Sequence, residues 1–152
     1  MFRIELLIFF VVVLVKNSVL YQTGSPVSRC NNLEPSHAGA VTQTSPFPYQ
    51  IIPGLDTVGN GQKLTVEIRA LEPSRIFRGF LLQARTTNDS ATIVGQFELT
   101  TGVAFNFRDC SGTRTSVTNA NNDEHQSLRF DWTAPFTYTG PIRFQYVFRK
   151  FN

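Results

Sequence analysis

The chain has 152 residues with a formal net charge of +3, and 41% of the residues are hydrophobic. A charge this small does not favour a nucleic-acid partner, which usually needs a concentrated basic surface. The two cysteines lack the spaced partner ligands of a zinc site, so we expect neither a metal centre nor a cofactor.

The start of the chain has the pattern of a secretory signal peptide. Leu6–Val15 is an unbroken apolar run that follows a short basic start. A membrane-spanning helix needs about twenty apolar residues, so this run fits the apolar part of a signal peptide; an uncleaved anchor is the alternative. We predict a signal peptide at residues 1–20, with cleavage between Ser18 and Ser25, and one domain at residues 21–152. The protein is then secreted and extracellular, and its mature form has no membrane span.

Two features of the sequence fit an extracellular protein. A secreted chain passes through an oxidising compartment, where Cys30 and Cys110 are expected to form one disulfide. Asn88-Asp89-Ser90 matches the acceptor sequence for N-glycosylation and lies in a polar turn. We therefore predict a glycan on Asn88.

The rest of the chain reads as short strands separated by turns. The proline-rich segment Glu34–Leu55 is predicted to be irregular, with short extended pieces around Tyr49–Ile52. Strands are predicted at Lys63–Ala70, Phe77–Arg85, Ile93–Leu99, Val103–Asp109, Thr113–Thr118, Leu128–Trp132 and Ile142–Arg149. No window of comparable length has a helical period.

Alternation within these runs predicts which side chains face the core. The last run is the clearest, with Ile142, Phe144, Tyr146 and Phe148 inward and Arg143, Gln145 and Arg149 outward. In the run Phe77–Arg85, one face holds Phe80, Leu82 and Ala84, and the other holds Leu81, Gln83 and Arg85.

Seven or eight short strands with one disulfide indicate an all-β fold, an antiparallel β-sandwich with an aromatic core. An eight-stranded barrel is the alternative architecture.

The sequence gives little support for catalysis. It contains no Gly-x-Ser-x-Gly elbow, no His-Glu-x-x-His and no phosphate-binding glycine loop. Nothing in the sequence supports a nucleophile–base pair that uses His37 or His125. We therefore expect no catalytic residues and predict that the protein is not an enzyme.

Two charged groups are candidates for binding. Asp123-Glu124 could supply oxygen ligands to calcium, but the spacing is not that of an EF-hand loop, and a solvated loop is favoured. The outward residues Arg129, Arg143 and Arg149 would form a basic patch if their strands were neighbours. Such a patch could attract anionic glycans or microbial surfaces.

Several segments together carry a family resemblance. They are Cys30-Asn31-Asn32-Leu33-Glu34-Pro35-Ser36-His37, Ser45-Pro46-Phe47, Pro53-Gly54, Phe77-Arg78-Gly79-Phe80-Leu81-Leu82-Gln83-Ala84-Arg85, Val94-Gly95-Gln96-Phe97, Cys110 and Phe130-Asp131-Trp132-Thr133-Ala134-Pro135. In this order they resemble the reeler domain, the module at the N-terminus of reelin and the spondins. Small secreted insect defence proteins, including those linked to nodulation around bacteria, consist of this domain alone.

The resemblance implies an immunoglobulin-like sandwich with a disulfide between Cys30 and Cys110. Two positions depart from the family pattern: Leu33 stands where many relatives have Met, and Thr118-Asn119-Ala120 replaces Thr-His-Ser. Any role of that histidine is therefore absent.

The implied function is non-enzymatic innate defence, in which the protein binds microbial surface polymers or the surface of haemocytes. The alternative is an extracellular-matrix or adhesion module that binds glycosaminoglycan or a protein partner.

Overall fold

The computed structural model describes residues 23–33, 48–88 and 91–149. The predicted signal peptide lies outside these residues. The described chain contains one 3-10 turn and eight strands: η1 (Val27–Arg29), β1 (Tyr49–Pro53), β2 (Lys63–Ala70), β3 (Gly79–Thr86), β4 (Gln96–Phe97), β5 (Phe105–Arg108), β6 (Ser116–Asn119), β7 (Ser127–Thr133) and β8 (Ile142–Arg149). The all-β prediction is confirmed, and the predicted bounds of β2 and β8 agree with the structure at both ends.

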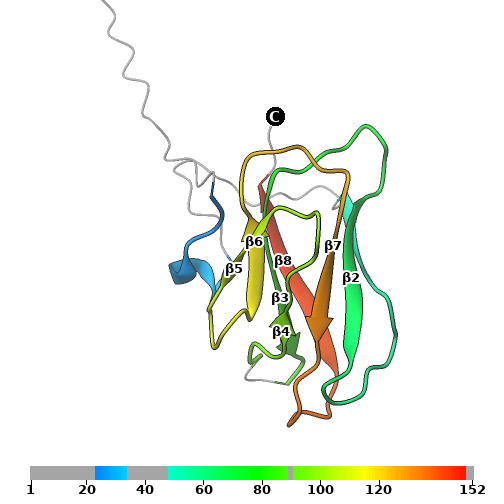
Figure 1. Cartoon of the computed structure of the whole chain (residues 1–152), viewed down its shortest axis with the longest axis vertical. Helices are drawn as coiled ribbons and strands as arrows, with labels where there is room; N and C mark the ends of the chain where they lie inside the picture. Colours follow the sequence, from blue (N-terminus) through cyan, green and yellow to red (C-terminus); the bar gives the residue numbers. More distant parts are fainter. Residues whose placement is uncertain (1–22, 34–47, 89–90, 150–152) are drawn as a thin grey trace, which may run out of the picture.

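The eight strands form two four-stranded antiparallel sheets that pack face to face (Figure 1). The first sheet has the order β1-β2-β7-β4, and the second has the order β5-β6-β3-β8. All strand pairs within these sheets are antiparallel. The architecture is therefore the predicted sandwich and not the barrel.

The core lies between the sheets and is rich in aromatic rings. The first sheet contributes the fully buried Phe97, Phe130 and Trp132. From the second sheet, Phe80 packs on Phe130 at 5.5 Å, and Phe144 meets Trp132 edge to face at 5.3 Å. Such pairs add to the free energy gained by burying the rings. The predicted inward residues of β8 all pack against this core.

Trp132 is fully buried because the chain makes room for it at Gly95. This glycine has a φ of +70°, and a Cβ atom there would lie 2.3 Å from Cζ2 of the indole. The close approach brings together Val94–Phe97 and Phe130–Pro135, two of the segments that carry the family resemblance. It also shortens β4 relative to the predicted strand Ile93–Leu99, because a left-handed residue interrupts the extended backbone.

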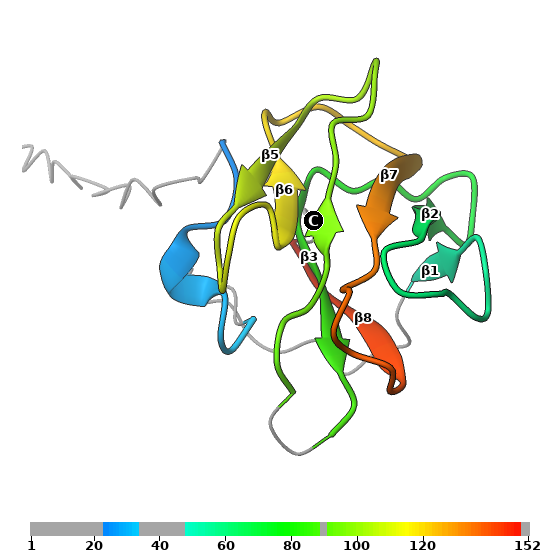
Figure 2. The ribbon, with the colours of Figure 1, turned by 60° about the horizontal axis from the view of Figure 1, so that its bottom comes forward.

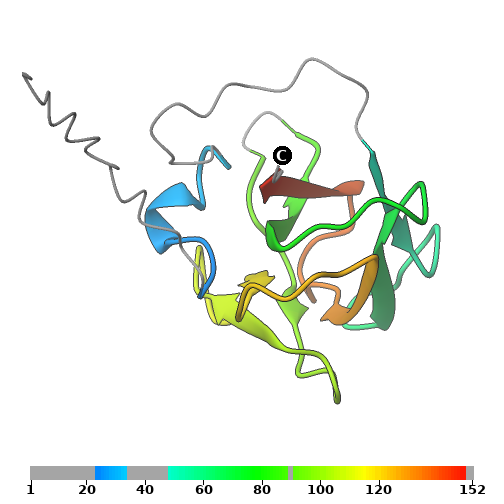
Figure 3. The same cartoon turned by 90° about the horizontal axis from the view of Figure 1, so that it is seen from above.

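Strand β3 is buried on both faces, which the alternation pattern did not predict. Leu81 and Gln83 face away from the core, yet their exposed fraction is 0%. The N-terminal segment 23–33, which contains η1, covers this outer face of the second sheet (Figures 2 and 3). The protein therefore has a third layer over part of the sandwich.

Candidate functional site

A disulfide attaches the N-terminal segment to the second sheet. Cys30 and Cys110 are bonded across a sequence separation of 80 residues, with their Cα atoms 5.4 Å apart. Cys30 is buried, and Cys110 follows β5 in a surface loop. This bond closes most of the described chain into one covalent loop.

Polar side chains of β3 hold the same segment. The amide of Gln83 donates to the carbonyl oxygen of Cys30 at 3.1 Å and contacts Sγ of Cys110 at 3.4 Å. The Arg85 guanidinium donates to Oε1 of Gln83, to the carbonyls of Cys30 and Asn31, and to the carbonyl of Ala91. The donors of Arg85 are thus used within the protein, so this arginine is structural.

A second arginine holds the start of the segment. Nε of Arg108 donates to the carbonyl of Ser25 at 2.6 Å, and its Nη2 donates to the carbonyl of Thr23 at 2.8 Å. The backbone amide of Ser25 donates to the hydroxyl of Thr118 at 2.9 Å. Thr118 is fully buried, so the bond from Ser25 gives its hydroxyl a partner that water cannot supply.

The predicted basic patch is wrong as a single surface. Arg129 lies on β7 of the first sheet, whereas Arg143 and Arg149 lie on β8 of the second sheet. Their strands follow one another in the chain but are not neighbours, because the chain crosses between sheets at the turn. Arg143 lies on the outer face of β8 near Arg85, whose pKa is lowered by burial and then by Arg143. Arg149 pairs with Gly79 at the far end of the strand.

Arg129 is part of an ion-paired network on the outer face of the first sheet. Glu67 accepts hydrogen bonds from Arg69 at 2.8 Å and from Arg129 at 3.1 Å. These bonds, the first of them most, hold the pKa of Glu67 below its usual value against the opposing effect of burial. A neighbouring ion pair joins Lys63 to Glu98. Opposite charges on this face therefore compensate one another.

The acidic side chains of the loop between β6 and β7 are also paired within the protein. Glu124 forms an ion pair with Arg78, and Asp123 accepts a hydrogen bond from the Asn121 amide at 2.6 Å. His125 packs against Phe77, and burial lowers the pKa of its imidazole, an effect that Asp123 partly offsets. In the described chain, no three His, Cys, Asp or Glu side chains gather as a possible metal site.

His37 lies outside the described residues. Among the residues that the structure does describe, none belongs to a helix long and apolar enough to cross a membrane.

A cleft lies at one end of the sandwich. The β1–β2 loop and the β7–β8 loop, at the lower end in Figure 1, enclose a cleft of about 480 Å³. Ligand-binding clefts commonly have volumes of about 300–1,000 Å³. Its described lining is Asp56, Thr57, Val58, Asn60, Ala134, Pro135, Tyr138, Thr139, Gly140, Pro141 and Ile142.

Hydrogen bonds between the two loops fix the shape of this cleft. The Asn60 amide donates to the carbonyl of Phe136 at 3.0 Å, and the amide of Ala134 donates to the carbonyl of Gln62 at 2.9 Å. The Tyr138 hydroxyl donates to the carbonyl of Pro141 at 3.0 Å, within its own turn. The cleft is therefore formed by segments about 80 residues apart, so no local motif could have identified it.

The predicted glycosylation site lies beside this cleft. Asn88 is exposed after β3, and the preceding Thr87 donates its backbone amide to the carbonyl of Pro141 at 3.2 Å. Pro141 lines the cleft. A glycan on Asn88 stays a prediction, and it would be attached at the rim.

Comparison with known proteins identifies relatives along most of the chain. The family model of the reeler domain matches residues 28–150. A Bombyx mori protein named as a candidate defence protein is 35% identical over 127 residues, which is 81% of this chain and 72% of that protein. The defense protein l(2)34Fc of Drosophila melanogaster is 34% identical over 82% of this chain and 75% of its own length.

Solved structures agree on the fold. The reeler domain of human F-spondin superposes with a TM-score of 0.58 at 21% identity, covering 68% of this chain and 79% of that one. The predicted immunoglobulin-like reeler fold is confirmed. A Drosophila melanogaster protein named as a candidate ferric-chelate reductase homologue is also 27% identical over 80% of this chain, but the match covers only 19% of that longer protein.

Proposed function

The chain belongs to the reeler-domain family. From this premise we propose that it is a non-enzymatic defence protein that acts outside the cell by binding microbial surfaces or the surface of haemocytes. The observation that carries the proposal is its kinship with insect proteins named for defence, each matched over about three quarters of its own length. The relatives named for ferric reduction match over about a fifth of theirs, so they give weak support for reductase activity.

The arrangement of charges supports binding at the loop end in preference to the sheet faces. On the outer face of the first sheet, Arg129 is paired with Glu67. On the outer face of the second sheet, the N-terminal segment covers β3 and accepts hydrogen bonds from Arg85 through the carbonyls of Cys30 and Asn31. The cleft between the β1–β2 and β7–β8 loops is a concave surface of the described chain where a ligand can be held on several sides.

The first experiment measures binding of the purified secreted protein to whole bacteria, to haemocytes, and to beads that carry heparin or matrix proteins. The proposal expects retention on bacteria or haemocytes that is stronger than retention on heparin. Selective capture by heparin or matrix proteins would instead establish the adhesion alternative.

A second experiment follows the transcript after bacterial challenge. A defence protein is expected to be induced, whereas a transcript level that does not change would argue against the proposal.

A further inference from the structure

We propose that the loop-end cleft is a subsite for an uncharged hexopyranose unit of a surface polysaccharide. This inference rests on the proposed binding of microbial surfaces and specifies the ligand chemistry and the residues. It depends on three properties of the cleft: its apolar wall, its free polar groups and its charge.

The apolar wall is formed largely by the β7–β8 turn. Tyr138 lines the cleft. Its ring lies over Gly140 of the same turn, so closely that a Cβ atom on this glycine would be 2.4 Å from the tyrosine oxygen. The hydroxyl is already bonded to Pro141, which leaves the ring as the group available to a ligand. Pro141 and Ile142 extend the apolar surface. The C–H face of a pyranose ring is the part of a sugar that packs against such a surface.

Free hydrogen-bonding groups surround this wall. Asp56, Thr57 and Thr139 line the cleft and are exposed, and within the described chain their side chains make no hydrogen bond. On the two sheet faces, by comparison, Glu67 of the first sheet and Arg85 of the second are paired within the protein. A sugar offers hydroxyl groups that both donate and accept, which matches a carboxylate and two threonine hydroxyls. Hydroxyl donors to the Asp56 carboxylate would make the stronger, charge-assisted bonds.

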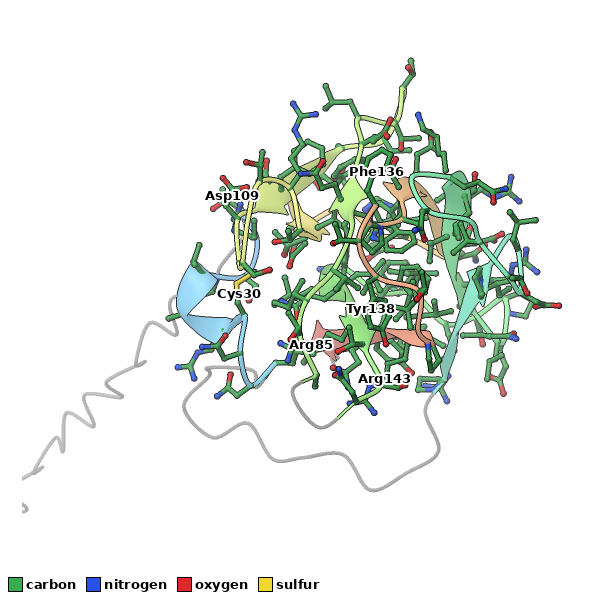
Figure 4. The ribbon with its side chains drawn as sticks, turned by 90° about the horizontal axis from the view of Figure 1, so that it is seen from below. Cys30, Arg85, Asp109, Phe136, Tyr138 and Arg143 are labelled. Atoms are coloured by element: carbon green, nitrogen blue, oxygen red, sulfur yellow. A yellow bond between two sulfur atoms is a disulfide. The ribbon has the colours of Figure 1, made fainter. Side chains whose placement is uncertain are left out.

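The charge of the cleft selects against anionic polymers. Of the described residues that line it, Asp56 alone carries a charge, and that charge is negative. A sulfated or phosphorylated sugar would place like charges together, which is unfavourable for binding. Arg143, the nearest arginine along the chain, lies on the outer face of β8, and Figure 4 shows it with Arg85 toward one margin of this end while Tyr138 lies nearer the middle. Neither Arg143 nor Arg85 is among the residues that line the cleft.

The test is isothermal titration calorimetry of the full secreted protein with three hexasaccharides. Two are uncharged, one built of glucose and one of N-acetylglucosamine, and the third is a sulfated heparin fragment of the same length. We expect at least one uncharged hexasaccharide to bind more tightly than the sulfated one, and the one that binds indicates the source of the natural polymer. Tighter binding of the sulfated fragment, or no binding of either uncharged one, would overturn the inference.

Variants then locate the site. Asp56→Ala and Tyr138→Ala are each expected to weaken binding of the uncharged hexasaccharide about tenfold, the usual effect of losing one charged hydrogen bond or one well-packed ring. Tyr138→Phe keeps the ring and is expected to bind as the native protein does. Arg143→Ala and Leu99→Ala, which change exposed residues outside the cleft, are the matched controls. Thermal melting of every variant confirms that it is folded.

The same variants separate this inference from the proposed function. If native protein and cleft variants bind bacteria equally well, the cleft is not the site, although the defence role stands. If the native protein fails to bind both bacteria and haemocytes, the proposed function itself is wrong. Loss of binding in Arg143→Ala but not in Tyr138→Ala would assign recognition to an anionic polymer on β8.

Discussion

Replacing both bonded cysteines tests the three-layer architecture most directly. We expect Cys30→Ser/Cys110→Ser to fold but to lose stability, and the double variant avoids leaving a reactive free thiol. The bond spans 80 residues, so the chain-entropy relation predicts a loss of about 4.5 kcal/mol, near the upper end of the measured range of about 2–5 kcal/mol. Local contacts change less, because a serine hydroxyl at position 110 can still accept from Gln83 and Ser116.

The assay is urea unfolding followed by the fluorescence of Trp132. This is the single tryptophan of the chain and is fully buried, so its emission reports the core. The midpoint is expected to fall, and the m value is expected to rise because an uncrosslinked unfolded chain exposes more surface. Amide hydrogen exchange of the double variant provides a second measurement. The amides of Ser25 and Cys30 are hydrogen-bonded in the N-terminal layer of the native protein, and in the variant they should exchange faster than the amides of β2.

Two results would refute this reasoning. An unchanged midpoint would mean that the bond does not restrict the unfolded chain as described. A lower midpoint with full protection of Ser25 and Cys30 would mean that Arg85 and Arg108 hold the third layer without the disulfide.

Three further predictions concern the core and the ion pairs. Gly95→Ala is expected to lower the free energy of unfolding by about 3 kcal/mol or more, measured by thermal melting, because it combines a positive φ with a clash against Trp132. Gly102→Ala is the control: it has a φ of +81° but open space around it, and should lower the free energy of unfolding by only about 1 kcal/mol. Equal losses of stability would show that Trp132 does not restrict position 95. Trp132→Ala should cost about 3–5 kcal/mol, and Phe136→Ala, at 75% exposure, should be within about 0.5 kcal/mol of the native protein; a neutral Trp132 variant would place the ring outside the core. The pKa of Glu67 is lowered in the folded state, so its ion pairing stabilises the protein above the ordinary carboxyl pKa of 4.5, and this stabilisation is lost as the pH falls through the lower folded value. The melting temperature of Glu67→Gln should therefore depend less on pH below about 5 than that of the native protein. Parallel curves of melting temperature against pH would contradict this role of Glu67.

Local alternation in the sequence determined most of the strands and their faces. In β8, Phe144 and Tyr146 were predicted to face inward, and they pack on the core. The period of two is a property of a single strand and needs no knowledge of its neighbours, so it can be read directly from the residues. In β3, Phe80, Leu82 and Ala84 were predicted to share one face, and all three belong to the core. The resemblance to reeler domains placed the two cysteines together.

Tertiary structure alone decided which surfaces are available for binding. Arg129 and Arg143 are both outward-facing, but β7 and β8 lie in opposite sheets, so the two arginines cannot form one patch. Leu81 and Gln83 are outward-facing yet buried, because residues 23–33 cover them. The cleft likewise joins Asp56 to Tyr138 across about 80 residues. Alternation fixes the face of a strand but carries no information about which distant segment packs against that face, and in a sandwich with long-range pairing this second choice determines where a ligand can bind.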